Sequence, residues 1–240
     1  MANPNDPMWN DSAEAWIRFV DAGDANRTDM LDEVMMRLVE MEPAGPIVDV
    51  GCGEGRFCRM LKNEGHEVIG IEPTTALREM AIERDPEGEY LPGFAEKLPL
   101  DDFSAQTLVY YVTWVDIDDL GSTIKEAYRV LRPGGRIVVS NVHPIFTASI
   151  GPGWIKDASG KKLHVGIADY RTQRGVLSEW CGIKVINHHR TFDSIFSTLL
   201  LNGFRLEYFE EPKPTRDSRL AEDESRVPNF VAMIWRKPWA

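Results

Sequence analysis

Three glycines at alternate positions follow an acidic residue at the end of a short apolar run, in residues 48–55 with the sequence VDVGCGEG. Glycine permits a tight turn from a strand into a helix, and its missing Cβ lets the backbone approach a bound ligand closely. The acidic side chains of Asp49 and Glu54 suit a ligand that carries an amine. We therefore expect a nucleotide-like ligand to lie over Gly51 and Gly53.

A second acidic residue stands at the end of the next apolar run. Glu72 follows Gly51 by 21 residues, at a place where a carboxylate can accept hydrogen bonds from both hydroxyls of a ribose. A nicotinamide dinucleotide would call for the fingerprint G-x-G-x-x-G, but its last position is Arg56. These residues favour S-adenosylmethionine over NAD as the ligand.

Hydrophobic periodicity predicts the elements that position these residues. Helical spacing predicts two amphipathic helices within residues 1–42, which form an N-terminal cap. From residue 47 onward, short apolar runs alternate with helical segments, which indicates a parallel sheet with crossover helices. This rhythm fails in residues 142–187, where we expect an inserted substrate lid with some antiparallel strand. The runs 204–208 and 230–235 predict a terminal hairpin, and the chain of 240 residues is expected to form one domain.

Four motifs in this order resemble the class I S-adenosylmethionine-dependent methyltransferases, in the small-molecule branch that includes the menaquinone and ubiquinone methyltransferases (methyltransferase type 11). They are residues 48–55, 70–73, 93–99 and 126–135. The resemblance implies an α/β fold with a Rossmann-like seven-stranded sheet of order 3-2-1-4-5-7-6, in which strand 7 is antiparallel. It also implies methyl transfer from S-adenosylmethionine.

The resemblance further implies which residues bind the cofactor. Asp49, Gly51 and Gly53 would lie at its methionine end, and Glu72 would bind its ribose. The segment that ends at Arg27 resembles a related subfamily in which an arginine before the first motif reaches the carboxylate of the cofactor. A solvated loop residue is the alternative for Arg27.

The adenine and the transferable methyl group would have their own neighbours. By the resemblance, Ala95 and Glu96 lie near the adenine, although Phe94 stands where family members often carry Asp or Asn. Tyr111 and Trp114 end the predicted fourth strand, where the family places groups around the methyl. Trp114 is expected to bind substrate through its aromatic face, with a core aromatic as the alternative.

Three residues near the inserted segment are candidates for the reaction itself. His143 follows the predicted fifth strand at the carboxyl end of the sheet, so it is the leading candidate for a catalytic general base. A structural or substrate-orienting histidine is the alternative. His189 and Arg190 resemble a His-Arg pair of the same subfamily and are expected to face the lid interior and bind substrate, unless they cap a helix.

The remaining composition limits the partners. Asp116, Asp118 and Asp119 more simply form a solvated helix entry than a metal site, and the cysteines show no CxxC pair, so no metal is expected. A formal charge of −11 without a Lys/Arg cluster disfavours nucleic acid. The sequence shows no apolar run long enough for a membrane span and no leader, which predicts a cytoplasmic protein. It does not determine the oligomeric state.

The sequence as a whole predicts a methyltransferase that moves a methyl group from S-adenosylmethionine to an oxygen or nitrogen of a small molecule. Three alternatives stay open. They are a tRNA or protein methyltransferase, an NAD-dependent oxidoreductase, and a protein that binds S-adenosylmethionine without catalysis.

Overall fold

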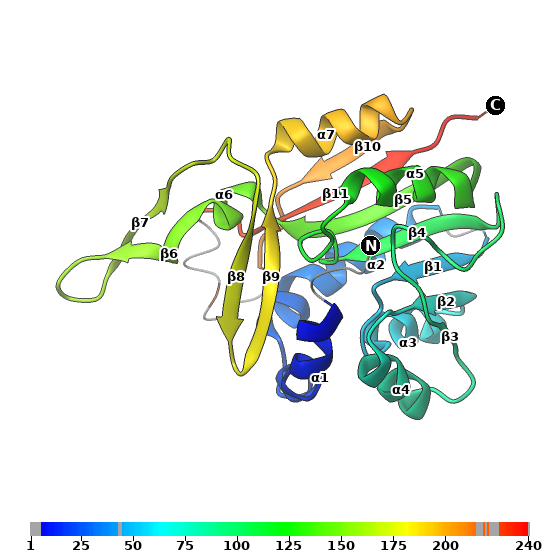
Figure 1. Cartoon of the computed structure of the whole chain (residues 1–240), viewed down its shortest axis with the longest axis horizontal. Helices are drawn as coiled ribbons and strands as arrows, with labels where there is room; N and C mark the ends of the chain where they lie inside the picture. The colour runs from blue at the N-terminus through cyan, green and yellow to red at the C-terminus, as the bar shows by residue number, and fades with distance from the viewer. Residues whose placement is uncertain (1–5, 43–44, 215–217, 219, 221–225, 240) are drawn as a thin grey trace.

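The computed structural model describes residues 6–42, 45–214, 218, 220 and 226–239, and a seven-stranded sheet forms its centre (Figure 1). Its strands are β1 (Ile47–Val50), β2 (Val68–Ile71), β3 (Glu89–Leu91), β4 (Ala105–Tyr111), β5 (Leu131–Val142), β10 (Arg205–Glu210) and β11 (Phe230–Arg236). Their order is β10-β11-β5-β4-β1-β2-β3, and β11 pairs antiparallel with both of its neighbours. With β10 as the sixth strand and β11 as the seventh, this arrangement confirms the predicted fold.

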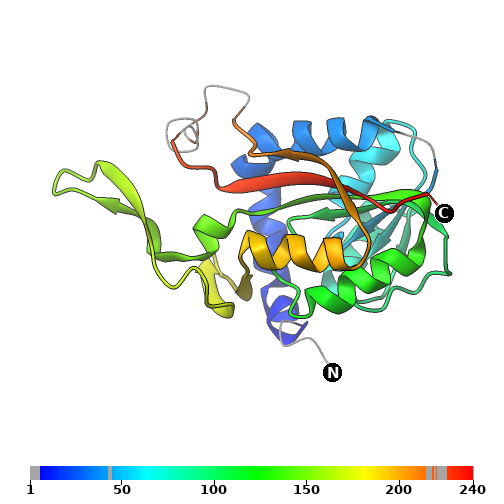
Figure 2. The same ribbon diagram turned by 90° about the horizontal axis from the view of Figure 1, so that it is seen from above.

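Helices cover both faces of the sheet. The helices of the described part of the chain are α1 (Asp6–Asp21), the π-helical turn η1 (Arg27–Leu31), α2 (Asp32–Glu40), α3 (Arg56–Asn63), α4 (Thr75–Arg84), α5 (Leu120–Val130), α6 (Pro144–Thr147) and α7 (Phe192–Leu201), and α1 and α6 pack mainly against other helices and the inserted strands. Figure 2 shows α2 on one face and α5 and α7 on the other. Because both faces are covered, β1 and β11 are buried along their whole length, as expected for continuous apolar runs. No helix among the described residues has the length and apolar character needed to cross a membrane.

Two antiparallel hairpins follow β5 and the short helix α6. One pairs β6 (Ser149–Lys156) with β7 (Lys162–Ile167), and the other pairs β8 (Arg174–Trp180) with β9 (Ile183–His189). In both ribbon views the β6–β7 hairpin extends away from the sheet (Figures 1 and 2). The predicted antiparallel strands of the insertion are therefore present.

The β8–β9 hairpin packs against the N-terminal helix α1. The hydroxyl of Ser12 donates to the carbonyl of Lys184 at 3.1 Å and accepts from the amide of the same residue at 3.0 Å. Ala15 of α1 packs with Ile183 and Val185 of β9 in a small hydrophobic cluster. The two predicted N-terminal helices are confirmed for the described residues 6–42; residues 1–5 of the predicted cap lie outside the described part. Chain segments about 170 residues apart thus form one wall beside the sheet.

Candidate active site

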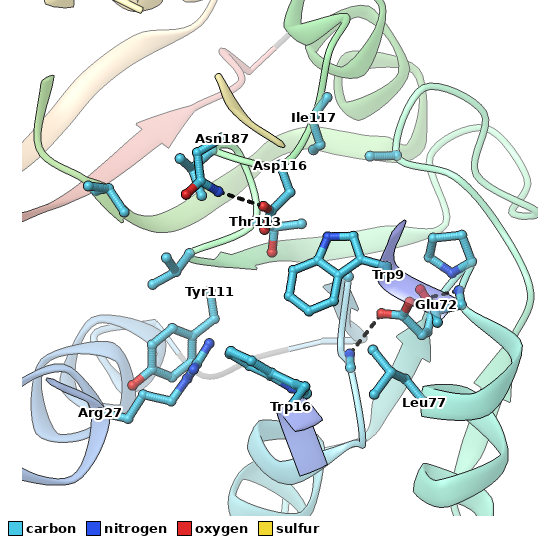
Figure 3. A pocket seen from close by; sticks show the side chains of 18 of the residues that line it. Trp9, Trp16, Arg27, Glu72, Leu77, Tyr111, Thr113, Asp116, Ile117 and Asn187 are labelled. Atoms are coloured by element: carbon cyan, nitrogen blue, oxygen red, sulfur yellow. Dashed lines mark hydrogen bonds between the residues drawn. The ribbon is translucent and has the colours of Figure 1, made fainter. Parts of the chain in front are cut away.

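A cavity of about 440 Å³ lies at the carboxyl ends of β1, β2, β4 and β5, which is where open α/β sheets bind their ligands (Figure 3). The turn after β1 and the residues that follow β2 form part of its wall. The loop after β4 forms another part, and α1 and the β8–β9 hairpin close the remaining side. Its described lining residues are mostly apolar or aromatic, with charged side chains from Asp24, Arg27, Glu72, Glu96 and Asp116.

The glycine turn after β1 adopts the conformation that the sequence predicts. Gly51 has φ +76° and Gly53 has φ +59°, in the left-handed region that disfavours residues with a Cβ. A Cβ at Gly51 would also lie 2.4 Å from Cγ2 of Thr113. The turn therefore needs glycine both for its backbone conformation and for its contact with the loop after β4.

Glu72 lies at the cavity wall and supports the glycine turn. Its Oε2 accepts from the amide of Gly53 at 2.9 Å, and its Oε1 accepts from the amide of Thr74 at 2.8 Å. The side chain is buried, and this burial raises the pKa of the carboxyl group. Because each carboxylate oxygen has more than one lone pair, Glu72 can still accept hydrogen bonds from a ligand hydroxyl.

Asp49 lines a smaller recess of about 50 Å³ that shares residues with the main cavity. Its Oδ2 accepts from the Cys58 thiol at 3.5 Å, whereas Oδ1 is buried without a hydrogen-bond partner in the described part of the chain. Burial raises the pKa of this carboxyl group to about 7. A buried acceptor without a hydrogen-bond donor costs free energy. An ammonium group of a ligand in the recess would donate to Oδ1 and remove this cost.

Arg27 lies where the recess meets the main cavity. Its guanidinium lies 4.8 Å from the ring centroid of Trp16 and 5.1 Å from that of Tyr111, and it donates to Asp24 at 3.1 Å. The Tyr111 hydroxyl donates to Asp32 at 2.7 Å, so its ring, not its hydroxyl, faces the site. A cation held by two rings at the mouth of the recess fits the carboxylate of an amino acid group.

Ala95 and Glu96 line the same cavity beside Phe94, as the resemblance implies for the adenine side. Burial raises the pKa of Glu96. The structure thus brings all eight predicted cofactor contacts to the main cavity or its recess: Arg27, Asp49, Gly51, Gly53, Glu72, Ala95, Glu96 and Tyr111.

The structure places His143 away from the described cavity lining, in a structural position. It is the N-cap of α6, where Nδ1 accepts from the amide of Ile145 at 3.1 Å. The other ring nitrogen, Nε2, lies 3.1 Å from Oε1 of Glu211 and is the donor when Nδ1 accepts. Desolvation by burial lowers its pKa. Since the ring has no lone pair left for a substrate proton, this geometry does not support the expected general base.

His189 and Arg190 also make structural contacts. The Nδ1 of His189 lies 2.7 Å from the hydroxyl of Thr147, and its Nε2 lies 2.7 Å from the carbonyl of Tyr170. Arg190 donates to the carbonyls of Trp114 and Asp118 at 2.9 and 2.7 Å. Both residues therefore fix loops around the cavity and do not form part of its described lining.

Trp114 and Asp116 differ from their predicted surroundings. Trp114 is 1% exposed and packs against Tyr110 in the core, so the structure supports its alternative as a core aromatic. Asp116 lines the cavity instead of a solvated helix entry, and its Oδ1 accepts from Nδ2 of Asn187 at 3.0 Å. Burial raises the pKa of Asp116 to about 8.

Sequence reasoning also missed the aromatic wall of the cavity. Trp9, Trp16 and Phe19 of α1 line it, together with Trp180 of the β8–β9 hairpin. The available signal was the set of aromatic residues at helical spacing in α1, but this spacing alone does not identify what the helix face covers. Among the described residues, no group of three His, Cys, Asp or Glu side chains is placed to hold a metal ion.

Comparisons with known proteins agree with this fold. Residues 48–139 match the family model described as "Methyltransferase domain". A solved structure of an S-adenosylmethionine-dependent methyltransferase from Mesorhizobium loti is 27% identical, with a TM-score of 0.75 over 90% of this chain and 99% of that one.

Two curated relatives match over shorter stretches. A malonyl-[acyl-carrier protein] O-methyltransferase from Serratia marcescens is 29% identical over 122 residues, which cover 51% of this chain and 48% of the relative. A demethylmenaquinone methyltransferase from Chlorobaculum tepidum is 37% identical over 97 residues, which cover 40% and 39% of the two chains. The chain thus spans about half or less of the length of these relatives.

The fold, the glycine turn and the matched domain are similar to those of the class I S-adenosylmethionine-dependent methyltransferases. S-adenosylmethionine is the cofactor that this class uses.

Proposed function

We propose that this protein transfers a methyl group from S-adenosylmethionine to a small molecule bound in the same cavity. The observation that carries the proposal is the unpartnered Oδ1 of buried Asp49 in a recess that continues the main cavity. An ammonium group supplies the missing donor, and Arg27 at the same recess pairs with a carboxylate. An amino acid with a nucleoside attached has both groups.

The other cavity residues fit the rest of the cofactor. Glu72 would accept from the ribose hydroxyls, and the wall of Phe94, Ala95 and Leu77 would hold the adenine by apolar contact. Bound S-adenosylmethionine supplies an electrophilic methyl group with a good leaving group. The chain therefore contributes mainly by positioning the acceptor and excluding water.

The shape of the site supports a small-molecule acceptor. Trp9 and Trp16 of α1 and Trp180 of the β8–β9 hairpin line the cavity on the side away from the sheet, so residues 142–187 and the N-terminal cap serve as a lid. A lid of this kind leaves room for a small group and shields it from solvent. The formal charge of −11 opposes binding of a polynucleotide.

The test is to incubate the protein with methyl-labelled S-adenosylmethionine and a cell extract, and then to separate small molecules from macromolecules. We expect label in the small-molecule fraction, strongly reduced for E72A because cofactor binding is weakened, and retained for E79A, since Glu79 is exposed on α4. Label in RNA or protein would refute the substrate class. Cofactor binding without any label would indicate a protein that binds but does not transfer, and tight binding of NAD would refute the proposal altogether.

A further inference from the structure

A second polar site lies in the cavity, apart from the residues assigned to the cofactor. Figure 3 shows Asp116, Asn187 and Thr113 together on one side, with Trp9 between them and Glu72. Asp116 comes from the loop after β4, and Asn187 comes from β9 of the inserted hairpin. Their hydrogen bond of 3.0 Å joins the sheet to the proposed lid across the cavity wall.

The loop that carries Asp116 is held from several directions. The amide of His188 donates to the carbonyl of Val115 at 2.6 Å, and Arg190 donates to the carbonyls of Trp114 and Asp118. These contacts fix the backbone on both sides of Asp116. A carboxyl group on such a supported loop has a defined position toward a bound molecule.

The surroundings of Asp116 are apolar and aromatic. The cavity lining nearest to it along the chain is Val115 and Ile117, and Trp9 and Trp180 face the same space from α1 and β8. Of the charged side chains that line the described cavity, four are acidic and one is basic, and that one, Arg27, already pairs with Asp24. The site therefore attracts a cation and repels an anion.

A carboxylate in a largely apolar wall interacts strongly with a cation, because little solvent screens the two charges. Asn187 donates to Asp116, and a ligand with a cationic N–H group would bring both a donor and the opposite charge to the same carboxylate. We propose that the methyl acceptor is a small hydrophobic amine and that Asp116, oriented by Asn187, binds its ammonium and accepts its proton. This inference rests on the proposed function, since it assigns the acceptor for that same cavity.

The proton transfer makes the amine reactive. An ammonium N–H bond breaks, the proton goes to the Asp116 carboxylate, and its bonding pair becomes the nitrogen lone pair. That pair forms the new bond to the methyl carbon, while the electron pair of the carbon–sulfur bond stays on sulfur. Asp116 later releases the proton to solvent, so the sum is a methylated ammonium, a neutral thioether and one proton.

The electrostatic surroundings of Asp116 are suited to this exchange. Burial, and to a smaller extent Glu72, raise its pKa, and Asn187 and Arg27 lower it, so that the pKa lies at about 8. Glu96 and the Asp24 side chain are the other charged groups of the described cavity wall. A carboxylate of this basicity takes a proton from an ammonium more readily than an ordinary aspartate does.

The test uses three probes of similar size, benzylamine, benzyl alcohol and benzoate, titrated into the 240-residue protein saturated with S-adenosylhomocysteine. The readout is the fluorescence of the cavity tryptophans, checked by calorimetry. We expect benzylamine to bind at least about 10-fold more tightly than benzyl alcohol, and benzoate to bind most weakly. D116N should reduce benzylamine affinity about 10-fold and leave benzyl alcohol within about 2-fold, and D118N, on the exposed side of the same loop, is the matched control.

Benzylamine affinity of the wild type should rise between pH 6.5 and 8.5, as Asp116 ionises, and that rise should be missing in D116N. Equal binding of amine and alcohol, an unchanged D116N, or no binding of benzylamine would overturn the inference. Binding of S-adenosylhomocysteine to D116N with wild-type affinity shows that the variant is folded. If S-adenosylhomocysteine itself does not bind the wild type, it is the proposed function that fails.

Discussion

Replacement of Glu72 by alanine tests the cofactor site most closely. The carboxylate holds two backbone amides, those of Gly53 at 2.9 Å and Thr74 at 2.8 Å, and it lines the cavity. A charged hydrogen-bond partner contributes about 1.5–3 kcal/mol, so loss of the contacts to ribose should weaken S-adenosylmethionine binding about 10- to 150-fold. The same change leaves two amides without their acceptor.

The loss of those amide contacts should also lower the free energy of unfolding. Each donor left unsatisfied costs about 1–3 kcal/mol, and relief of the buried carboxylate offsets part of this, which leaves a net loss of about 1–3 kcal/mol for E72A. E72Q keeps one acceptor oxygen and should be intermediate in both properties. Calorimetric titration with S-adenosylmethionine measures the affinity, and urea denaturation measures the stability.

E79A is the control for both measurements, because Glu79 is exposed on α4, and its replacement should change neither quantity by more than about 0.5 kcal/mol. Unchanged cofactor affinity in a folded E72A protein would remove Glu72 from the ribose site and refute the reasoning. Loss of stability alone would reduce Glu72 to a support of the glycine turn.

Three further predictions concern other residues. Because burial raises the Asp49 pKa to about 7, the folded state binds more protons than the unfolded state between about pH 4 and 7, so this group destabilises the fold as pH rises. The stability of D49N relative to wild type should therefore increase across that window by up to about 4 kcal/mol, as measured by urea denaturation at several pH values. D49N should also bind S-adenosylmethionine more weakly at pH 8. A difference in stability between D49N and wild type that does not depend on pH would contradict this prediction. G51A should lower the free energy of unfolding by at least about 1–2 kcal/mol, because residue 51 has a positive φ and its Cβ would contact Thr113. Adding T113S to G51A removes the Cγ2 methyl and should recover only part of this loss in thermal denaturation. Full recovery would show that backbone strain is unimportant. H143A should lower the free energy of unfolding by about 1–2 kcal/mol, because the helix cap of α6 is lost. It should leave the turnover of labelled S-adenosylmethionine within about 2-fold of wild type. A large fall in turnover at unchanged stability would instead support a catalytic role for His143.

The fold could be predicted from the sequence because its signals are local. The glycine turn, the apolar runs of β1 and β11, and the four ordered motifs each lie within a few residues. The strand order then followed from the resemblance, and the cavity-lining positions of Gly51, Gly53 and Glu72 followed from where each strand ends.

The direction of side chains beyond the strand ends could not be predicted in this way. After β4 the chain reaches Val112 with φ +59°, a strained value for a β-branched residue, so the strict alternation of faces ends there. As a result Trp114 points into the core and Asp116 lines the cavity, opposite to what their types suggested.

The contacts that close the site are far apart in the sequence. His143 is held by Glu211, 68 residues away, and Ser12 of α1 binds Lys184 of β9, 172 residues away. Periodicity carries no information about such pairs, because it reports only which face of an element is apolar. The aromatic lining and the structural histidines therefore emerge only from the folded chain.

The measurement that tests the central claim most directly is a crystal structure of the protein with S-adenosylhomocysteine bound. We expect the ribose hydroxyls on the carboxylate of Glu72, and the amino acid group in the recess between Asp49 and Arg27. An adenosine bound elsewhere, or a recess filled only by water while Glu72 contacts only Gly53 and Thr74, would contradict the assignment of this cavity to the cofactor.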